Sequence, residues 1–572
     1  MKRGLNMHSL ENIIRKHALR NAFDYGKTSP NSIIGKIIHE FADAKKDVKG
    51  AMEIAQKICK EVNKMGKAQI EEELKNYSFE EKKEEEKKGI ELEGATEGKV
   101  ITRFPPEPSG YLHIGHAKAA FIDYEAAKKY KGKFLLRFDD TNPEKEKEEF
   151  VLAIQKDLKW LGIVPDEVLF ASDYMREIYS HAHTLIKKGK AYICTCASEE
   201  MKKARMEGKE CACRKRNGKE NTLLFEKMTA GEMEEGEAAI RFRGEMNSQN
   251  TAMRDPTLMR MVKAPHYRQA NKYSAWPSYD FEGAIMDSIG GITHAMRTKE
   301  YELRDELYFA ILDALSLRKP ALIEFSRLQI KGMPVSKRLI TPLIEEGKVE
   351  GYDDFRLPTL RGLARRGILP RAIKEFVLSF GISKVESEPN LEKLLSENKK
   401  LIDKTSPRLF FAREPVKIEV KNAPQKEALL RNHPTEKMGE RKVKAGNVFY
   451  IPKKDALELK AGSTFRLKGL YNVKVEEVQK GKIICTYEGD ELIDCPKIQW
   501  VCEGFLNCRI LIPHELFIGE KFNEENLTIE EGYCEGECAK LKIGAIVQFE
   551  RYGFARLDKI SKELLTFIYI SS

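Results

Sequence analysis

Residues 103–117 read Arg-Phe-Pro-Pro-Glu-Pro-Ser-Gly-Tyr-Leu-His-Ile-Gly-His-Ala. A short apolar run at 99–104 leads into the prolines, which do not continue a strand or a helix. An alanine-rich helical pattern begins near Gly115, and a second apolar run follows at 133–138. The order strand, loop, helix, strand predicts a βαβ unit with a parallel sheet, which places a ligand at the carboxyl ends of the strands.

Two histidines mark the point where the loop becomes the helix. His113 and His116 are three residues apart, and Gly115 lies between them. A helix N-terminus offers unpaired amides and a partial positive charge, which suit a polyphosphate, and a glycine lets a nucleotide approach the backbone. The pattern therefore predicts a nucleotide site. Taken alone, such a histidine pair is more often a cap or a surface feature, so other parts of the sequence have to decide.

Four further blocks follow the first in a fixed order. The five blocks are 103–117, Arg-Phe-Asp-Asp-Thr-Asn-Pro at 137–143, Trp-Pro-Ser-Tyr-Asp-Phe at 276–281, Phe-Ser-Arg-Leu at 325–328 and Val-Ser-Lys-Arg at 335–338. Together they resemble the signatures of class I aminoacyl-tRNA synthetases, in particular the glutamyl and glutaminyl branch of archaeal and eukaryotic type. Five ordered blocks across more than two hundred residues are far more specific than any one of them.

The second signature departs from the commonest form in the family, Lys-Met-Ser-Lys-Ser. Pro334 and Val335 replace its first two residues and Arg338 its last, while Ser336 and Lys337 remain. The resemblance assigns to Lys337 the neutralisation of charge as adenylate and pyrophosphate separate. A flexible ammonium suits that role, because it can follow a moving phosphate.

The resemblance implies ATP as a substrate, with Mg²⁺ carried mainly by its phosphates. A carboxylate attacks the α-phosphate, so the protein has to align two anions and offset their charge, and no general base is needed. We expect His113, His116 and Lys337 to be catalytic. The residues expected to bind ATP are Pro108, Ser109, Gly110, His113, Gly115, His116, Ser336 and Lys337.

A glutamate pocket should supply two cationic contacts and one acidic contact. Arg103 and Arg297 are the candidates for the two carboxylates, since guanidinium binds carboxylate bidentately. Asp139 and Glu107 would face the α-ammonium, and the Tyr279 hydroxyl would complete the pocket. The position of Arg297 resembles the one that is Arg in glutamyl enzymes and uncharged in glutaminyl ones, where a buried guanidinium would lack a counter-ion. We therefore expect Arg297 to bind the side-chain carboxylate.

Four of the eleven cysteines form a cluster, Cys194-Thr-Cys196 and Cys211-Ala-Cys213, with 14 residues between the pairs. Four thiolates suit a closed tetrahedral Zn²⁺ site with a structural role. Related enzymes carry a similar cluster in the insertion that binds the acceptor stem. The spacing within each pair is one residue rather than two, and reduced buried thiols without metal are the alternative that the sequence leaves open.

A basic segment follows the second signature, with no acid between Asp354 and Glu375. Its basic residues are Arg356, Arg361, Arg365, Arg366, Arg371 and Lys374. Such a stripe suits phosphates on the inside of a bent tRNA, and an ordinary solvated helix face is the alternative. We expect the first four of these residues to bind tRNA.

The chain has 572 residues, with 99 Lys and Arg against 89 Asp and Glu, so its formal net charge is +10. This length predicts several domains, and the basic excess fits a polyanionic partner without proving one. No apolar run approaches the roughly 20 residues that cross a bilayer, and the N-terminus lacks the apolar core of a signal peptide. We therefore expect a cytoplasmic, monomeric protein that does not act at a membrane.

Changes in pattern along the chain predict a multidomain fold. Residues 80–88 contain only Glu and Lys, a charge block that cannot form a core, and short alternating strands begin beyond Pro407. With functional names implied by the resemblance, the expected parts are a helical N-terminal appendage with a charged linker (1–95), the first half of an α/β Rossmann-like catalytic domain (96–190), an acceptor-stem-binding insertion (191–265), the second catalytic half (266–345), a helical connector (346–406) and all-β anticodon-binding barrels (407–572).

The implied reaction has two steps. ATP and L-glutamate would form glutamyl-adenylate with release of pyrophosphate, and a terminal ribose hydroxyl of tRNA(Glu) would then attack the mixed anhydride. The alternatives are activation of glutamine on the same fold, a tRNA-binding scaffold without catalysis, and a small-molecule nucleotidyltransferase. Arg297 argues against the first alternative, the intact His113, His116 and Lys337 argue against the second, and the long C-terminal β region argues against the third. Charging of tRNA(Gln) with glutamate stays open.

Overall fold

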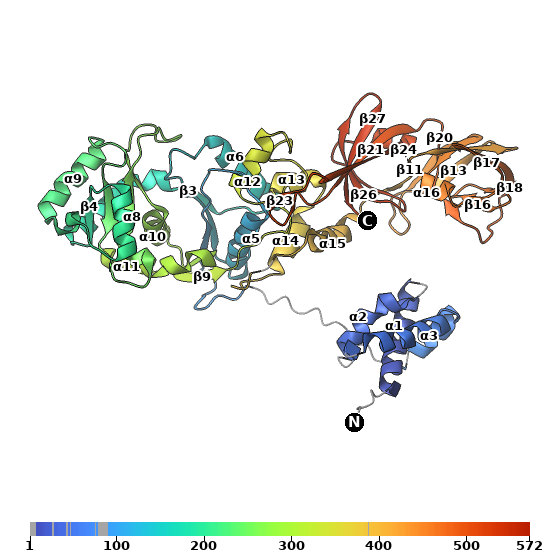
Figure 1. The fold of residues 1–572 in the computed structure, drawn as a ribbon, viewed down its shortest axis with the longest axis horizontal. Helices are drawn as coiled ribbons and strands as arrows, with labels where there is room; N and C mark the ends of the chain where they lie inside the picture. The colour runs from blue at the N-terminus through green and yellow to red at the C-terminus, as the bar shows by residue number, and fades with distance from the viewer. Residues whose placement is uncertain are drawn as a thin grey trace. The chain divides into compact units, whose positions relative to one another are not determined.

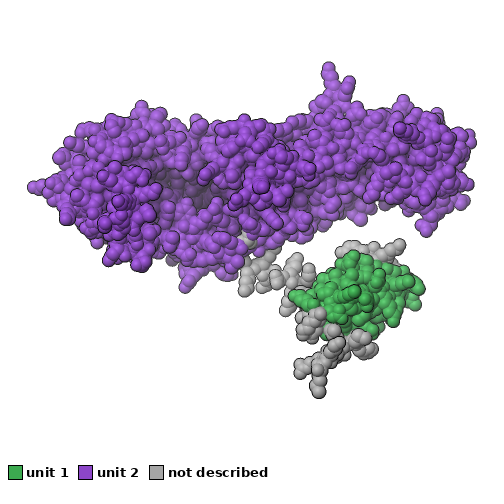
Figure 2. All heavy atoms as spheres, viewed as in Figure 1, with its two compact units in different colours: residues 1–87 green, residues 88–572 purple. Residues whose placement is uncertain are grey.

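The structure is a computed structural model that describes residues 7–25, 28–41, 44–45, 47–74, 76–77, 90–386 and 388–572. The chain divides into two compact units, residues 1–87 and 88–572 (Figure 2). The predicted charge block at 80–88 lies outside the described residues. Within the described ranges, no helix is long and apolar enough to span a membrane.

The first unit is a bundle of helices, which confirms the predicted helical appendage. Its helices are α1 (Met7–Tyr25), α2 (Pro30–Glu40), α3 (Val48–Val62) and α4 (Lys67–Leu74). Helix α3 begins where the Asp47 carboxylate accepts a hydrogen bond from the Gly50 amide. Its buried residues, Ala51, Ala55, Ile58, Cys59 and Val62, recur at helical spacing and pack on one face against the other helices.

A parallel sheet begins the second unit, as the βαβ pattern predicts. Strands β1 (Ile101–Phe104), β2 (Lys133–Phe138) and β3 (Glu167–Phe170) lie in this order, and helix α5 (Ile114–Lys129) joins the first two. Strands β8 (His294–Thr298) and β9 (Ala321–Phe325) form a further parallel pair. Thr293 exchanges hydrogen bonds with Ile101, so β8 lies beside β1. The carboxyl ends of β1 and β8 therefore meet at one edge.

An antiparallel sheet with its own core interrupts the catalytic part of the chain. Its strands, in spatial order, are β4 (Ala191–Cys194), β5 (Ala239–Phe242), β6 (Thr257–Met261) and β7 (Ala275–Pro277). The helices of this region include α7 (Met175–Lys187), α8 (Ser198–Glu207) and α9 (Gly218–Ala230). The fully buried Trp276 lies in the core of this region, which also receives apolar residues from α10 (Tyr279–Ile289) and α11 (Asp305–Leu315).

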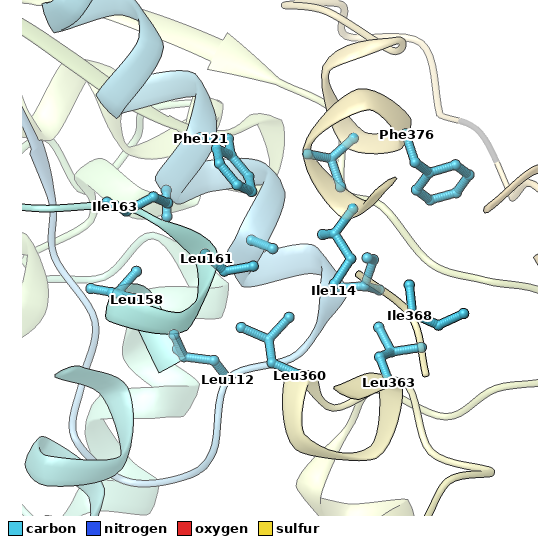
Figure 3. Close-up of a cluster of buried hydrophobic side chains, with 14 of the residues drawn as sticks. Leu112, Ile114, Phe121, Leu158, Leu161, Ile163, Leu360, Leu363, Ile368 and Phe376 are labelled. Carbon is cyan, nitrogen blue, oxygen red and sulfur yellow. The ribbon is translucent and has the colours of Figure 1, made fainter. Parts of the chain in front are cut away.

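The connector helices pack directly against the helix of the first signature. They are α13 (Leu360–Arg366), α14 (Pro370–Leu378) and α15 (Leu391–Ile402), and they follow α12 (Lys337–Glu345), which ends the second catalytic half. Figure 3 shows Phe121 of α5 in one apolar cluster with Leu158 of α6 (Glu148–Leu161), Leu363 of α13 and Phe376 of α14. Burying each such side chain contributes about 1.5–3 kcal/mol, so this cluster holds the connector to the catalytic core.

Two seven-stranded sheets follow the connector and confirm the predicted barrel-like β region. One has the order β19-β16-β17-β18-β12-β15-β20 and the other β10-β25-β26-β27-β21-β24-β11. The strands of the first are β12 (Val416–Lys421), β15 (Val448–Ile451), β16 (Thr464–Leu467), β17 (Asn472–Gln479), β18 (Lys482–Gly489), β19 (Lys497–Ile498) and β20 (Val501–Cys502). Those of the second are β10 (Arg408–Leu409), β11 (Phe411–Arg413), β21 (Leu506–Pro513), β24 (Leu527–Cys534), β25 (Ile546–Phe549), β26 (Gly553–Ile560) and β27 (Leu564–Ser571).

The second sheet combines strands that are far apart in the sequence. The second sheet takes strands β10 and β11 from residues 408–413, before the chain has entered the first sheet. Strand β11 pairs antiparallel with β24, more than a hundred residues further along. Within the larger unit, Figure 1 shows the sheet of β4 at one end and strands β16 to β18 at the other, with the parallel sheet between them.

Candidate active site

The two predicted histidines lie against each other at the start of α5. His113 is the N-cap residue, and its Nδ1 accepts a hydrogen bond from the Gly115 amide at 3.1 Å. His116 Nδ1 accepts one from the His113 amide at 3.2 Å, and the rings stack with centroids 3.8 Å apart. Because each Nδ1 acts as an acceptor, each neutral ring carries its proton on Nε2. Both Nε2–H groups are thus available as donors.

Both histidines are neutral at physiological pH. Burial, with the charge of the neighbouring Arg327, lowers the pKa of His116 to about 4. Burial also holds the pKa of His113 well below its usual value, and His116 and Arg327 add to the effect. A neutral imidazole still donates a hydrogen bond to a phosphate oxygen, so the pair serves as fixed dipoles while Arg327 supplies the charge nearby.

The block at 325–328 packs against the first signature. A Cβ atom on Gly115 would lie 3.2 Å from the Leu328 carbonyl oxygen and 2.9 Å from His113 Cε1, so a larger residue would crowd both. Buried Lys118 donates to the Ser326 carbonyl at 2.7 Å and to its hydroxyl at 3.1 Å. These contacts place Arg327 beside the histidines. The sequence block alone predicts no separate role for Arg327.

The two signatures meet through Lys337. This residue begins α12, directly after Ser336 at the N-cap. Its Nζ donates to the Ser109 carbonyl at 3.0 Å and lies 5.4 Å from the centre of the Phe150 ring. Ser109 belongs to the loop of Pro108 and Gly110, so the structure brings the residues predicted to bind ATP from both signatures to one place.

A small cavity brings together three residues predicted to bind the amino acid. Its lining residues are Arg103, Tyr279, Asp280, Gly283, Ala284, Asp287, Arg297 and Tyr308. Arg103 is 2% exposed, and its Nε and Nη2 donate to Asp287 at 2.8 and 3.2 Å while its Nη1 donates to the Met296 carbonyl. Arg297 is 7% exposed on β8, and its Nε has no hydrogen-bond partner among the residues that the structure describes.

Asp287 organises this cavity, although no local pattern in the sequence singled it out. It accepts hydrogen bonds from Arg103, from Arg137 Nη1 at 2.6 Å and from the Tyr308 hydroxyl at 3.0 Å. Burial acts to raise its pKa, but the two guanidinium groups outweigh burial and lower it. Asp287 is therefore an ionised carboxylate that holds both arginines in place.

The two acids predicted to face the α-ammonium are placed differently. Asp139 is 7% exposed and is bound bidentately by Arg137, at 2.6 and 3.2 Å. Glu107 is exposed and accepts a hydrogen bond from the Asn142 amide at 3.5 Å. Neither residue lines the small cavity. Their role toward an ammonium group stays a prediction.

The basic segment after the second signature is largely paired within the chain. Arg356 donates to Asp354, Arg361 lies 3.6 Å from Asp157, and Arg365 binds Asp558 through two hydrogen bonds. Two of these acids, Asp157 and Asp558, are remote in sequence, so an inspection of the segment alone does not reveal them. Arg366 is 5% exposed and makes no ion pair with any residue that the structure describes. Whether these arginines bind tRNA stays a prediction.

The four predicted metal ligands lie together. The sulfur atoms of Cys194, Cys196, Cys211 and Cys213 are all within 4.8 Å of one another. Cys194 Sγ is 4.0 Å from Cys211 Sγ, and Cys196 Sγ is 3.6 Å from Cys213 Sγ. The Thr195 amide also points at Cys213 Sγ, at 3.5 Å. Four thiols at this spacing match the donor set of a closed zinc site.

A basic cleft of about 620 Å³ lies where the two β-sheets meet. Its lining residues include Arg408, Phe410, Arg431, Arg441, Lys468, Gln548, Glu550 and Arg551. Five of these carry positive charge and one carries negative charge, and each of the five cations also lies in an ion pair with an acid of the chain.

Three sequence families match consecutive parts of the chain. The catalytic domain of "tRNA synthetases class I (E and Q)" matches residues 99–404. Two anti-codon binding domains of the same class match residues 406–488 and 497–558. The first match contains all five blocks, and the other two cover most of the two β-sheets.

Archaeal proteins are similar to the chain over nearly their whole length. A glutamate–tRNA ligase of Nitrosopumilus maritimus (strain SCM1) is 44% identical over 564 residues, covering 97% of this chain and 98% of the relative. One of Cenarchaeum symbiosum (strain A) is 42% identical and covers 95% and 97%. One of Pyrococcus furiosus is 39% identical and covers 98% and 99%. The likeness therefore includes the N-terminal helical unit.

Proposed function

The chain belongs to the class I tRNA synthetases for glutamate and glutamine, and from this membership we propose that it ligates L-glutamate to tRNA(Glu) at the expense of ATP. The resemblance noted in the five blocks is thereby confirmed. The products are L-glutamyl-tRNA(Glu), AMP and diphosphate. The observation that supports the choice of glutamate is the buried Arg297, which lies in one cavity with Arg103 and Tyr279 and whose Nε has no partner among the described residues.

The geometry suits the first half-reaction. The Nε2–H groups of His113 and His116 are free to donate to phosphate oxygens, and Arg327 and Lys337 supply positive charge at the same place. A carboxylate that attacks the α-phosphate needs alignment and charge compensation, which fixed donors supply without reorganisation. Mg²⁺ bound by the phosphates would offset further charge. Glutamate-dependent exchange of pyrophosphate into ATP, with tRNA(Glu) present, tests this step; no exchange would contradict it.

We expect Arg297→Ala to reduce kcat/KM for glutamate by about 10–100-fold. A charged hydrogen bond in a partly desolvated pocket contributes about 1.5–3 kcal/mol, and alanine removes it. Glutamine should lose less, because its amide forms no ion pair. The assay is aminoacylation with each amino acid over a concentration series. An equal loss for both amino acids would mean that Arg297 holds the shared α-carboxylate, and the side-chain role would then pass to Arg103.

For the tRNA, we assign the anticodon to the basic cleft between the β-sheets. Its walls come from both segments that match anti-codon binding domains. Arginine and lysine side chains suit the phosphates of the tRNA. The part of the chain at 191–265, which carries the cysteine cluster, is assigned to the acceptor stem, and residues 346–406 connect the catalytic halves to the β-sheets.

We also propose that the four cysteines hold one structural Zn²⁺ ion per chain. The close sulfur atoms and the absence of a fifth donor in the described cluster support a closed site. Elemental analysis after chelator-free purification should find one equivalent of zinc, and Cys196→Ser should lower it. As a control, Cys485→Ser removes a thiol of the distant strand β18 and should leave the zinc content unchanged. Protein that is folded and zinc-free would contradict the proposal.

A further inference from the structure

Arg297 already has a carboxylate partner within the chain. Its Nη2 donates to Asp305, the first residue of α11. The Arg297 side chain is 6% exposed and that of Asp305 is 28% exposed, so the acid lies at the solvent side of the pair. A substrate carboxylate that reaches Arg297 therefore meets a guanidinium whose charge is already neutralised.

A second carboxylate faces the same guanidinium from the neighbouring strand. Glu324 on β9 is the register partner of Arg297 on β8, and its side chain is 7% exposed. Glu324 Oε2 binds Lys384 at 2.5 Å, while its Oε1 is buried and accepts no hydrogen bond from the residues that the structure describes. Asp305 and Glu324 thus form a pair of carboxyl groups beside the arginine proposed to select the substrate.

The charged groups around this pair already carry a net negative charge. Arg297 and Lys384 face Asp305 and Glu324, and Glu302 of the short helix Lys299–Arg304 also binds Lys384, at 2.8 Å. A further carboxylate would leave uncompensated negative charge in a mostly buried space, which is unfavourable where the dielectric is low. Two neighbouring carboxyl groups relieve such an excess by sharing one proton.

We propose that Asp305 is a positioning residue that couples glutamate binding to the uptake of a proton. Asp305 neutralises Arg297 when no substrate is bound. When glutamate binds, its side-chain carboxylate replaces Asp305 as the partner of the guanidinium. The Asp305–Glu324 pair then retains one proton taken from water, which restores the charge balance. This inference rests on the proposed function, since Arg297 has to receive that carboxylate. Glutamine carries a neutral amide and takes up no proton.

The proton is available near neutral pH. Burial, together with the contact to Glu324, raises the pKa of Asp305 to about 7, although Arg297 acts to lower it. A bound carboxylate raises it further, so binding consumes a proton and weakens as the pH rises above 7. In the wild type, KM for glutamate should rise by up to about tenfold per pH unit between pH 7 and 8.5. The inhibition constant of glutamine as a competitor should stay flat.

Two variants on helix α11 separate this account from a structural role. Asp305→Asn keeps the size of the side chain and removes its titration, so the rise of KM with pH should disappear and KM at pH 8 should not exceed that of the wild type. Asp313→Asn changes an acid on the same helix that pairs with Lys319 and is 62% exposed, and it should keep the wild-type slope. A full slope in Asp305→Asn would overturn the inference.

Calorimetry tests the inference without a variant. Glutamate is titrated into the wild-type chain with tRNA(Glu) at pH 7.5, in two buffers of different ionisation enthalpy. We expect an uptake of about 0.5–1 proton per glutamate bound. Binding without proton uptake would overturn the role of Asp305 and leave the proposed function intact. Failure to bind or charge glutamate at all would instead overturn the proposed function.

Discussion

Lys337→Ala is expected to lower the rate of adenylate formation by about 10²–10³-fold, or roughly 3–4 kcal/mol in the barrier. Lys337 Nζ contacts the Ser109 carbonyl of the first signature, so its charge lies where the phosphates of ATP are proposed to bind. The loss should appear in kcat, because the charge is needed most as pyrophosphate departs. Pyrophosphate exchange at saturating glutamate and tRNA(Glu) measures it.

A neighbouring lysine provides the control for this prediction. Lys331 lies six residues earlier on an exposed part of the same loop, and its side chain makes no ion pair with the described residues. Lys331→Ala should leave the exchange rate within about twofold of the wild type, since surface changes are usually small. If Lys337→Ala exchanges within threefold of the wild type, the second signature does not act on ATP.

Asp287→Ala should be the most destabilising single change in the catalytic part of the chain. Its carboxylate is 1% exposed and pairs with two buried guanidinium groups, those of Arg103 and Arg137. Removing one partner of a buried ion pair costs about 3–5 kcal/mol, because the remaining charge has no compensation. Thermal unfolding followed by calorimetry should show a lower transition for this part of the chain, and activity should be lost with it.

The exposed acid at position 313 again serves for comparison. Asp313→Ala removes a surface pair with Lys319, which contributes at most about 1 kcal/mol. The lowered pKa of Asp287 also predicts how stability depends on pH. The Asp287 carboxylate stabilises the fold at neutral pH, and this stabilisation is lost only in acid, as the pH falls through the lowered pKa. Equal unfolding temperatures for the two variants would show that Asp287 does not hold the arginines.

Local patterns were sufficient for much of the fold. The run at 99–104, the helical segment after Gly115 and the run at 133–138 formed the expected βαβ unit, because each depends on residues close in sequence. The alternation beyond Pro407 likewise predicted β-sheets. This alternation did not predict that β10 and β11 pair with strands more than a hundred residues away, because the sequence of a short strand does not specify its distant partner.

The same limit applies to the site. His113, His116 and Lys337 stand in compact motifs that can be recognised without a structure. Asp287 and Asp305 stand in no such motif, and their importance depends on contacts that folding creates: Arg103 and Asp287 are 184 residues apart in the chain. The arginines after the second signature show the converse, because carboxylates from distant segments neutralise charges that look free in the sequence.

Aminoacylation of separate tRNA(Glu) and tRNA(Gln) transcripts, each with labelled glutamate and labelled glutamine, tests the central claim most directly. We predict ATP-dependent charging of tRNA(Glu) with glutamate and no comparable charging of either tRNA with glutamine, since Arg297 lies in the same small cavity as Arg103 and Tyr279. Charging of tRNA(Gln) with glutamate would extend the tRNA range and leave the choice of amino acid intact. Efficient charging with glutamine, or no charging of any tRNA, would contradict the account.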